Sequence, residues 1–262
     1  MEERKALFFD IDGTLFDGST KSILPSTKKM LDELTKHPNY DLYLSTGRSS
    51  LTLGHLNEYK HYFRGLNLSN GQEIYIDGKL IENNYINPND LDSLLQKAEI
   101  VGIPIVMILE DKVYANFFNK EGYDNLTSFI KTDVIDLNHQ PFDLSLNVLQ
   151  LWLFANNDVI DEFFKDVENL VAIKWGTYGA DIIPKGSSKA RGIEIIQKEM
   201  GYKLENMYAF GDGDNDAPMF KVVGTSVAMG NGSILAKENA TMITDDIKED
   251  GLFNSVKKLN LI

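Results

Sequence analysis

Two aspartates, Asp10 and Asp12, directly follow the apolar segment ALFF at residues 6–9. Such a segment is typical of a buried strand in a parallel sheet, whose carboxyl end points into the crevice where open α/β sheets bind ligands. At a spacing of two residues on extended backbone, the two carboxylates project the same way and repel each other unless a cation lies between them. Mg²⁺ fits, because it prefers oxygen ligands and needs only one or two carboxylates besides water and phosphate. A carboxylate can also be a nucleophile that forms an aspartyl-phosphate. The alternative is a strand that ends in a polar turn with solvated acids.

A second apolar segment ends in Ser45-Thr46-Gly47-Arg48. Thr46 offers a hydroxyl and Gly47 an unobstructed N–H at the end of a predicted strand, before a helix expected at residues 49–59. This arrangement suits the binding of phosphate oxygens by a hydroxyl and a helix N-terminus. The same dipeptide often only caps a helix, and that alternative stays open.

Lys189 lies in the segment PKGSSKARGIEII at residues 184–196. Ser187 or Ser188 is the expected N-cap of a helix at residues 188–200, which places Lys189 in the first helical turn. A cation there interacts unfavourably with the helix dipole. Because the chain keeps a lysine at this position despite the cost, the lysine indicates a functional role. The alternative is a solvated surface lysine.

The segment MYAFGDGDNDAPM at residues 207–219 is a predicted strand followed by an acidic loop framed by glycines. The loop contains Asp212, Asp214, Asn215 and Asp216. An EF-hand calcium loop is excluded, because it requires a bidentate glutamate at its twelfth position and a helix on each side. The loop therefore predicts a second group of oxygen ligands or a polar turn.

In this order, the motifs DxDGT, STG, K and GDGDND resemble those of the haloacid dehalogenase superfamily of phosphotransferases. The resemblance covers essentially the whole chain, and its details are similar to the Cof-type phosphatases with the larger (type IIB) α+β cap. It implies an α/β fold, with a doubly wound, Rossmann-like parallel-sheet core and an inserted α+β cap domain. It also implies a Mg²⁺-dependent phosphatase of small phosphorylated metabolites, sugar phosphates first, with flavin or pyridoxal phosphates as alternatives.

The resemblance assigns chemical roles to the acidic residues. Asp10 would be the nucleophile that forms the aspartyl-phosphate, and Asp12 the general acid and base. The Mg²⁺ ligands would be the Asp10 carboxylate, the Asp12 backbone carbonyl and Asp212, with Asp216 supporting them from behind.

The remaining motif residues would contact the phosphoryl group. Thr46 and the N–H of Gly47 would hold it, and Lys189 would neutralise its charge and orient Asp10. Asn215 would contact the phosphate or Lys189. A phosphate monoester is a dianion that repels a carboxylate nucleophile, so a metal ion and a lysine are what this reaction requires.

The periodicity of apolar residues predicts the elements that position these side chains. The core is expected in two parts, residues 1–85 and 184–262, split by an inserted cap domain at residues 86–183 with its own sheet. The expected core strands are residues 6–10, 41–45, 66–68, 206–211, 225–229 and 242–243, with a hairpin around Asp77-Gly78; the core helices are 26–37, 49–59, 188–200, 215–222, 233–239 and 250–258. The expected cap helices are residues 89–100, 121–131 and 158–168, and the cap strands are 103–109, 112–118, 146–154, 171–175 and 180–183.

Composition narrows the class of protein. The 262 residues carry a formal net charge of −13, which disfavours nucleic acids and anionic membranes as partners. Cysteine is absent, which excludes disulfides, thiol catalysis and cysteine-bound zinc. No apolar segment approaches the length of a membrane span, and no signal peptide is recognisable, so a cytoplasmic protein is expected, as a monomer or weak dimer.

Three other functions remain open at the level of sequence. A phosphomutase shares the nucleophile but returns the phosphoryl group to a sugar. A phospho-acceptor signalling module also combines acidic residues, Mg²⁺ and a lysine, although it should carry neither an acid/base such as Asp12 nor an inserted cap. A non-catalytic metabolite-binding protein is disfavoured by the intact motifs.

Overall fold

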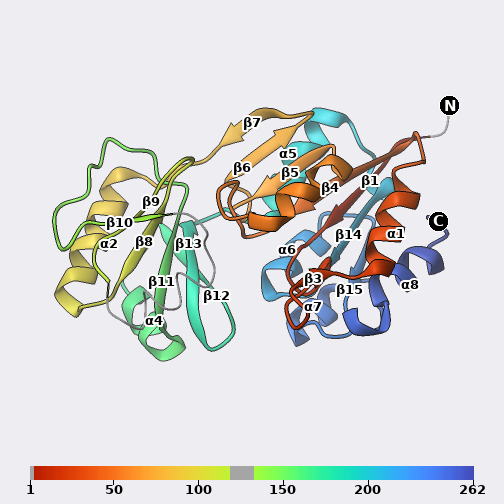
Figure 1. The fold of residues 1–262 in the computed structure, drawn as a ribbon. Coiled ribbons are helices and arrows are strands. Elements are labelled where there is room, and N and C mark those ends of the chain that lie inside the picture. The colour runs from red at the N-terminus through yellow and green to blue at the C-terminus, as the bar shows by residue number, and fades with distance from the viewer. Residues whose placement is uncertain (1–2, 119–132) are drawn as a thin grey trace. The chain divides into compact units, whose positions relative to one another are not determined.

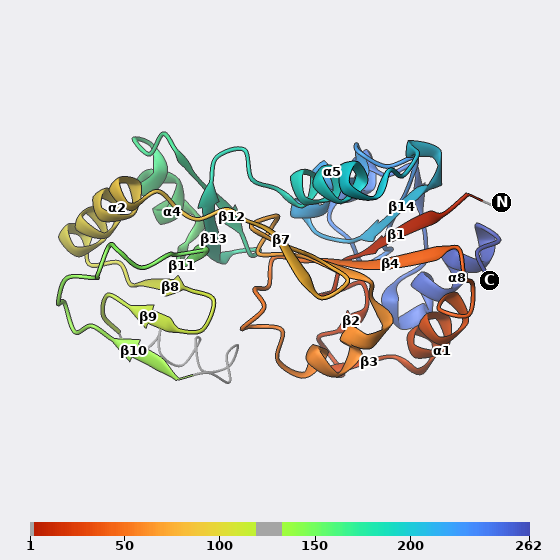
Figure 2. The same ribbon diagram turned by 90° about the horizontal axis from the view of Figure 1, so that it is seen from above.

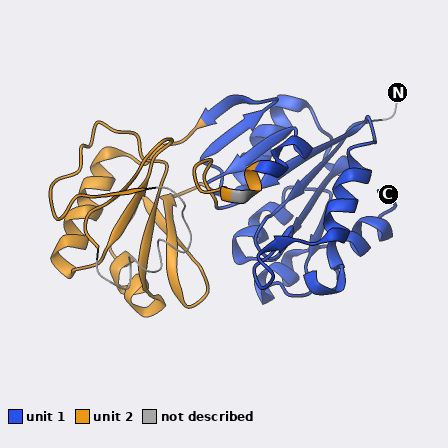
Figure 3. Cartoon of the chain, viewed as in Figure 1, with its two compact units in different colours: residues 1–47, 58–82, 188–262 blue, residues 48–57, 83–187 orange. Residues whose placement is uncertain are grey.

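The computed structural model describes residues 3–118 and 133–262. The chain divides into two compact units, shown in Figure 3. Unit 1 consists of Met1–Gly47, Glu58–Glu82 and Ser188–Ile262, and unit 2 of Arg48–Asn57 and Asn83–Ser187. The helix expected at residues 121–131 lies outside the described residues.

Unit 1 is built around an eight-stranded sheet with the order β16-β15-β14-β1-β4-β5-β6-β7 (Figure 1). From β16 to β5, neighbouring strands are parallel, and the antiparallel strand β6 then continues into β7. The chain adds strands on one side of β1 and later on the other, so the order reverses beside β1, where doubly wound folds bind ligands. The strands are β1 (Lys5–Phe9), β4 (Tyr40–Ser45), β5 (Gly65–Leu68), β6 (Glu73–Ile76), β7 (Lys79–Asn83), β14 (Met207–Gly211), β15 (Thr225–Ala228) and β16 (Met242–Ile243).

Helices cover both faces of this sheet, as Figure 2 shows for α5 on one face and α1 and α8 on the other. Alternate strand residues face opposite sides, so Phe8 belongs to the same core cluster as Ile193 of α5, and the rings of Phe9 and Phe210 stack 4.8 Å apart. The α-helices associated with unit 1 are α1 (Pro25–Leu34), α5 (Lys189–Met200), α6 (Ala217–Phe220), α7 (Ile234–Asn239) and α8 (Gly251–Lys258). Short 3₁₀ helices are η2 (Leu204–Asn206), η3 (Asp214–Asp216) and η4 (Ile247–Glu249), and a small hairpin joins β2 (Phe16–Asp17) to β3 (Ser22–Ile23).

Unit 2 has its own sheet, with the order β10-β9-β8-β11-β13-β12 among the described residues. Apolar side chains of α2 and α4 pack on one face, while Trp152, Phe154 and Trp175 cluster with the other face. The elements are α2 (Pro88–Val101), β8 (Ile105–Ile108), β9 (Val113–Ala115), β10 (Val134–Asp136), β11 (Gln150–Asn156), α4 (Asn157–Phe164), β12 (Leu170–Lys174) and β13 (Tyr178–Pro184).

The expected α/β architecture is confirmed, with a doubly wound core and an inserted α+β domain, but one element was predicted wrongly. Residues 49–59 do not form an α-helix that begins after Gly47; a 3₁₀ helix, η1 (Gly54–Tyr62), begins later. Ser49 and Thr52 explain the delay, because their hydroxyls exchange hydrogen bonds with each other's backbone N–H groups and so form a turn that competes with a helix. The strand β10 and the β2–β3 hairpin were not expected. No helix in the described ranges has the length and hydropathy needed to cross a membrane.

Candidate active site

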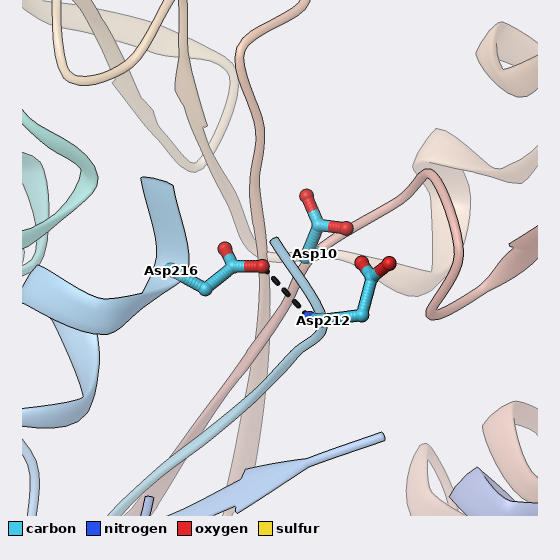
Figure 4. A group of neighbouring side chains, drawn as sticks. All are labelled: Asp10, Asp212 and Asp216. Atoms are coloured by element: carbon cyan, nitrogen blue, oxygen red, sulfur yellow. Dashed lines mark hydrogen bonds between the residues drawn. The ribbon is translucent and has the colours of Figure 1, made fainter. Parts of the chain in front are cut away.

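The ends of three adjacent parallel strands bring the predicted site residues together. Asp10 follows β1, Thr46 follows β4 and Asp212 follows β14, and β1 pairs with both of the others. The Asp10 N–H donates to Phe210 O over 2.9 Å, which ties the loop after β1 to β14. Side chains that lie 202 residues apart in the sequence therefore meet at one edge of the sheet (Figure 4).

Asp10, Asp212 and Asp216 form an acidic cluster, with one carboxylate oxygen of each within 4.8 Å of the others. The carboxylate of Asp216 is already engaged. Its Oδ2 accepts the N–H groups of Asp212 and Gly213, each over 2.8 Å, and Figure 4 shows the first of these hydrogen bonds. Its Oδ1 accepts from Lys189. Asp10 and Asp212 are therefore the members of the cluster that fit a divalent cation, with Asp216 behind them.

Lys189 is fully buried between two carboxylates. Its Nζ lies 2.6 Å from Asp10 Oδ1 and 2.6 Å from Asp216 Oδ1. Ser188, one of the two serines predicted for this role, is the N-cap of α5, and its Oγ accepts the N–H of Arg191 over 3.2 Å. The two anions offset the unfavourable position of a cation in the first helical turn.

Electrostatics show an excess of negative charge at this edge. Burial raises the pKa of Asp10 well above its usual value; Lys189 opposes this shift, and Asp216, Asp212 and Asp12 add to it. Burial and then the charge of Asp216 raise the pKa of Asp212 to about 7. Burial lowers the pKa of Lys189, but its two carboxylates outweigh burial, so its pKa lies above the ordinary value. One lysine does not balance these acids, and an oxygen-rich site of this kind suits Mg²⁺.

Asp12 lies in a different environment from Asp10. The chain leaves the extended conformation at Ile11, whose carbonyl accepts the N–H groups of Leu15 and Phe16. Asp10 is therefore buried and Asp12 exposed, although the sequence predicted two carboxylates projecting alike from one strand. The Asp12 carboxylate is not a member of the acidic cluster found among the described residues.

Gly13 permits the close approach of the first loop to Asp212. Its φ is +84°, and a Cβ at this position would lie 2.2 Å from Asp212 Oδ2. Two side chains that sequence reasoning missed complete the contact. Thr14 Oγ1 donates to Asp212 Oδ1 over 3.3 Å, and Asn231 Nδ2 donates to Gly13 O over 2.9 Å. Thr14 belongs to the DxDGT motif, so its position was a usable signal, whereas nothing local marked Asn231.

The phosphate-binding candidates lie on neighbouring loops of unit 1. Thr46 is buried at the end of β4, and Gly47 follows it without the predicted helix. Thr46 O accepts the N–H of Asn70, and Asn70 Oδ1 in turn accepts Asn215 Nδ2 over 3.1 Å. Asn215 was expected to contact phosphate or Lys189, and Asn70 is a partner that was not predicted. The Asn70-Gly71 dipeptide could have marked this position in the sequence, because Asn and Gly are typical of turns that need a positive φ. Asn70 has a φ of +53°.

Comparison with known proteins identifies the family. The profile of haloacid dehalogenase-like hydrolases matches residues 7–256. The chain belongs to this family. The resemblance predicted from the four motifs is thus confirmed. Among relatives of this hydrolase, the putative phosphatase YkrA of Bacillus subtilis is 30% identical over 99% of each chain.

Two further relatives of this hydrolase have more specific names. The 5-amino-6-(5-phospho-D-ribitylamino)uracil phosphatase YcsE of Bacillus subtilis is 25% identical, over 97% of this chain and 94% of its own length. The solved structure of BT4131, a sugar phosphatase of HAD subclass IIB, matches with a TM-score of 0.90 at 27% identity, over 98% of this chain and all of its own. This haloacid dehalogenase-like chain is therefore an enzyme, a phosphatase of this fold.

Proposed function

We propose that the enzyme hydrolyses phosphate monoesters of small metabolites through an aspartyl-phosphate on Asp10. The observation that carries this proposal is the buried Lys189, whose ammonium joins Asp10 to Asp216 beside Asp212. A buried cation held against a carboxylate at a strand end is suited to a nucleophile that must approach a dianionic phosphoryl group.

The chemistry follows two displacements at phosphorus. An oxygen of Asp10 attacks, the bond from phosphorus to the substrate oxygen breaks, and Asp12 donates a proton to the leaving alkoxide. Asp12 then takes a proton from water, which attacks the aspartyl-phosphate, releases inorganic phosphate and restores the Asp10 carboxylate. Thr46, the N–H of Gly47 and Asn215 hold the phosphoryl oxygens, and Lys189 stabilises their charge. Mg²⁺, bound by Asp10, the Asp12 carbonyl and Asp212, would supply charge neutralisation at the phosphoryl group.

The substrate class is proposed as sugar phosphates. The support is the overall similarity to the subclass IIB sugar phosphatase BT4131, and YcsE makes a ribityl-bearing phosphate a second candidate. Flavin and pyridoxal phosphates are less favoured alternatives. A panel of phosphorylated metabolites, assayed for released inorganic phosphate, tests the class. Formation of an isomeric sugar phosphate without free phosphate would identify a phosphomutase instead.

Variants at the two aspartates test the mechanism. Asp10→Asn should abolish turnover, because an amide oxygen does not form a stable phosphoryl intermediate. Asp12→Asn should slow single turnovers of a sugar phosphate far more than those of nitrophenyl phosphate, whose leaving group needs little protonation. Equal slowing of both substrates would contradict the acid role of Asp12.

We propose further that the inserted domain, residues 86–183, carries substrate choice while the core carries the chemistry. Binding energy from parts of the substrate far from phosphorus can raise turnover as well as affinity. Replacing residues 86–183 by a Gly/Ser linker should therefore lower kcat/KM for the best metabolite much more than for nitrophenyl phosphate. Leu51 packs against the unit 2 cluster that contains Trp152 and Phe154. Because the truncation removes this cluster and would expose Leu51, the truncated protein should also carry Leu51→Ser. A folded truncated core with an unchanged ranking of substrates would overturn the assignment.

A further inference from the structure

Asn67 of β5 connects the two segments that carry the proposed phosphate contacts. Its buried Nδ2 donates to Lys189 O over 2.8 Å and to Ser45 Oγ over 2.9 Å. Its own backbone carbonyl accepts the N–H of Thr46 over 2.9 Å. Because Lys189 O can only accept, the amide nitrogen must face it, so the orientation of this side chain is fixed by chemistry. One residue thus contacts the start of α5 and the end of β4.

The other half of the amide makes Asn67 costly to bury. Asn67 Oδ1 is buried and has no hydrogen-bond partner in the described part of the chain. An unsatisfied buried acceptor is destabilising, and this cost offsets part of what the two hydrogen bonds of Nδ2 contribute. The residue is therefore better explained by what Nδ2 holds than by its contribution to the core.

The first turn of α5 is shaped to receive Asn67. A Cβ at Gly192 would lie 1.9 Å from Asn67 Oδ1 and 2.4 Å from its Cγ, so no larger residue fits without displacing the amide. Glycine is a poor helix former, and α5 accepts this disadvantage at Gly192. Beside this contact, a Cβ at Gly71 would lie 2.2 Å from Ser188 O, and Arg191 Nη1 donates to Gly71 O over 2.9 Å. The turn that carries Lys189 is thus held closely against the segment that follows β5.

We propose that Asn67 is a positioning residue that fixes Lys189 relative to the loop of Thr46 and Gly47. The side chain of Lys189 pairs with Asp10. Its backbone carbonyl accepts from the Asn67 amide of β5, and the same amide nitrogen donates to Ser45 at the end of β4. The inference rests on the proposed function, in which Lys189 stabilises the phosphoryl group in transfer. It adds a residue that touches neither substrate nor metal.

The first test replaces the amide by an apolar side chain of similar shape. Asn67→Leu should lower kcat for the best substrate by about tenfold to a hundredfold, with KM changed less than about threefold, because a displaced lysine weakens the transition state more than the ground state. The matched control is Tyr43→Phe, which removes another buried hydrogen bond of unit 1, from the Tyr43 hydroxyl to the Tyr202 hydroxyl over 2.7 Å. It should leave kcat unchanged. Wild-type kcat in folded Asn67→Leu would overturn the proposal.

The second test uses the fit between Asn67 and Gly192 and does not depend on how well Asn67→Leu folds. Gly192→Ala should lower kcat, because its methyl group displaces the amide. In Asn67→Ala/Gly192→Ala the collision is gone but the hydrogen bonds are absent, so kcat should stay as low as in Asn67→Ala. Full recovery of kcat in the double variant would mean that Asn67 only fills space, and it would refute the positioning role.

A third readout is independent of turnover. Lys189 is buried, so acetic anhydride should not label its ammonium in the native protein. Asn67→Leu should increase labelling at Lys189, located by peptide mass spectrometry, while Tyr43→Phe should not. Unchanged labelling would contradict the proposal. If the wild-type protein hydrolysed no phosphate ester but labelling at Lys189 still rose in Asn67→Leu, the proposed function would fail while the positioning role survived.

Discussion

Lys189 and Asp216 form an ion pair with 2.6 Å between Nζ and Oδ1, and neither side chain is exposed to solvent. The second oxygen of the same carboxylate accepts the N–H groups of Asp212 and Gly213. Asp216 therefore fixes the lysine and the backbone of the proposed metal-binding loop with one side chain. Any change in its charge acts on both.

We expect Asp216→Asn to impair stability and activity together. The amide would leave Lys189 with one anionic partner. The NH₂ group of the amide would also face a donor, either Lys189 or the N–H groups of Asp212 and Gly213. Removing one partner of a buried ion pair typically costs about 3–5 kcal/mol of unfolding free energy, and we expect the lower end because Asp10 still pairs with Lys189. Turnover should fall by about a hundredfold or more through the misplaced lysine. Urea unfolding and steady-state kinetics measure the two effects.

Asp214→Asn is the matched control, because Asp214 is an exposed acid on the same loop. It should change stability by less than about 0.5 kcal/mol and leave turnover near the wild-type value. A similar loss of turnover in both variants would show that the net charge of the loop, rather than the Asp216 contacts, controls activity.

Gly13→Ala should damage the site through geometry alone. The added methyl would lie 2.2 Å from Asp212 Oδ2, on a backbone whose φ of +84° already disfavours a side chain. We expect turnover to fall by at least about tenfold, with a weaker apparent affinity for Mg²⁺, because a proposed metal ligand is displaced. Gly18→Ala provides the comparison, since a Cβ at Gly18 would meet nothing within 4 Å. Equal Mg²⁺ titration curves for the two variants would disagree with the assignment of Asp212 as a ligand.

Chelation should abolish phosphatase activity, and Mg²⁺ should restore it while Ca²⁺ should not. Ca²⁺ takes more ligands at longer distances, which favours binding of both Asp10 oxygens and removes the attacking one. The measurement is phosphate release after treatment with excess EDTA, followed by titration with each ion. Full activity in excess EDTA would refute a metal-dependent mechanism.

A pH effect on stability is expected far from the site, at Asp41. Burial raises the pKa of this carboxyl, but hydrogen bonds from Arg4, Tyr202 and Arg64 outweigh burial and leave the pKa below its ordinary value. A group whose pKa is lowered by folding stabilises the protein above its unfolded pKa of about 3.9, and this contribution disappears as the pH falls through the folded pKa. Asp41→Asn should therefore be less stable than wild type by about 2 kcal/mol at pH 7.

The difference between wild type and Asp41→Asn should be constant from pH 7 to about pH 5 and should shrink toward pH 3. Urea unfolding at several pH values measures it, and Asp111→Asn, at an exposed turn, serves as the control. A difference that did not change between pH 5 and pH 3 would contradict the ionic role of Asp41.

The sequence alone determined the fold class and the order of most elements. Short apolar segments before Asp10, Thr46 and Asp212 predict parallel strands, and parallel strands that share one edge must bring their terminal residues together. The Ser188 cap and the position of Lys189 were also local, since a cap depends on backbone and side-chain groups within one turn. These features could be predicted because neighbouring residues in the chain specify them.

The apolar pattern did not show local turns held by polar groups, and tertiary structure decided what depends on contacts between distant segments. Ser49 and Thr52 formed a turn where a helix was predicted, because side-chain hydrogen bonds competed with the helical pattern. The turn at Ile11 buried Asp10 and left Asp12 exposed, which the spacing of two residues did not predict. Asn67 and Gly192 are adjacent only after β5 and α5 have packed, so neither carried a signal in the sequence. Residue types and local spacing thus determined which chemistry the chain can perform, and packing between distant segments decided which side chains hold that chemistry in place.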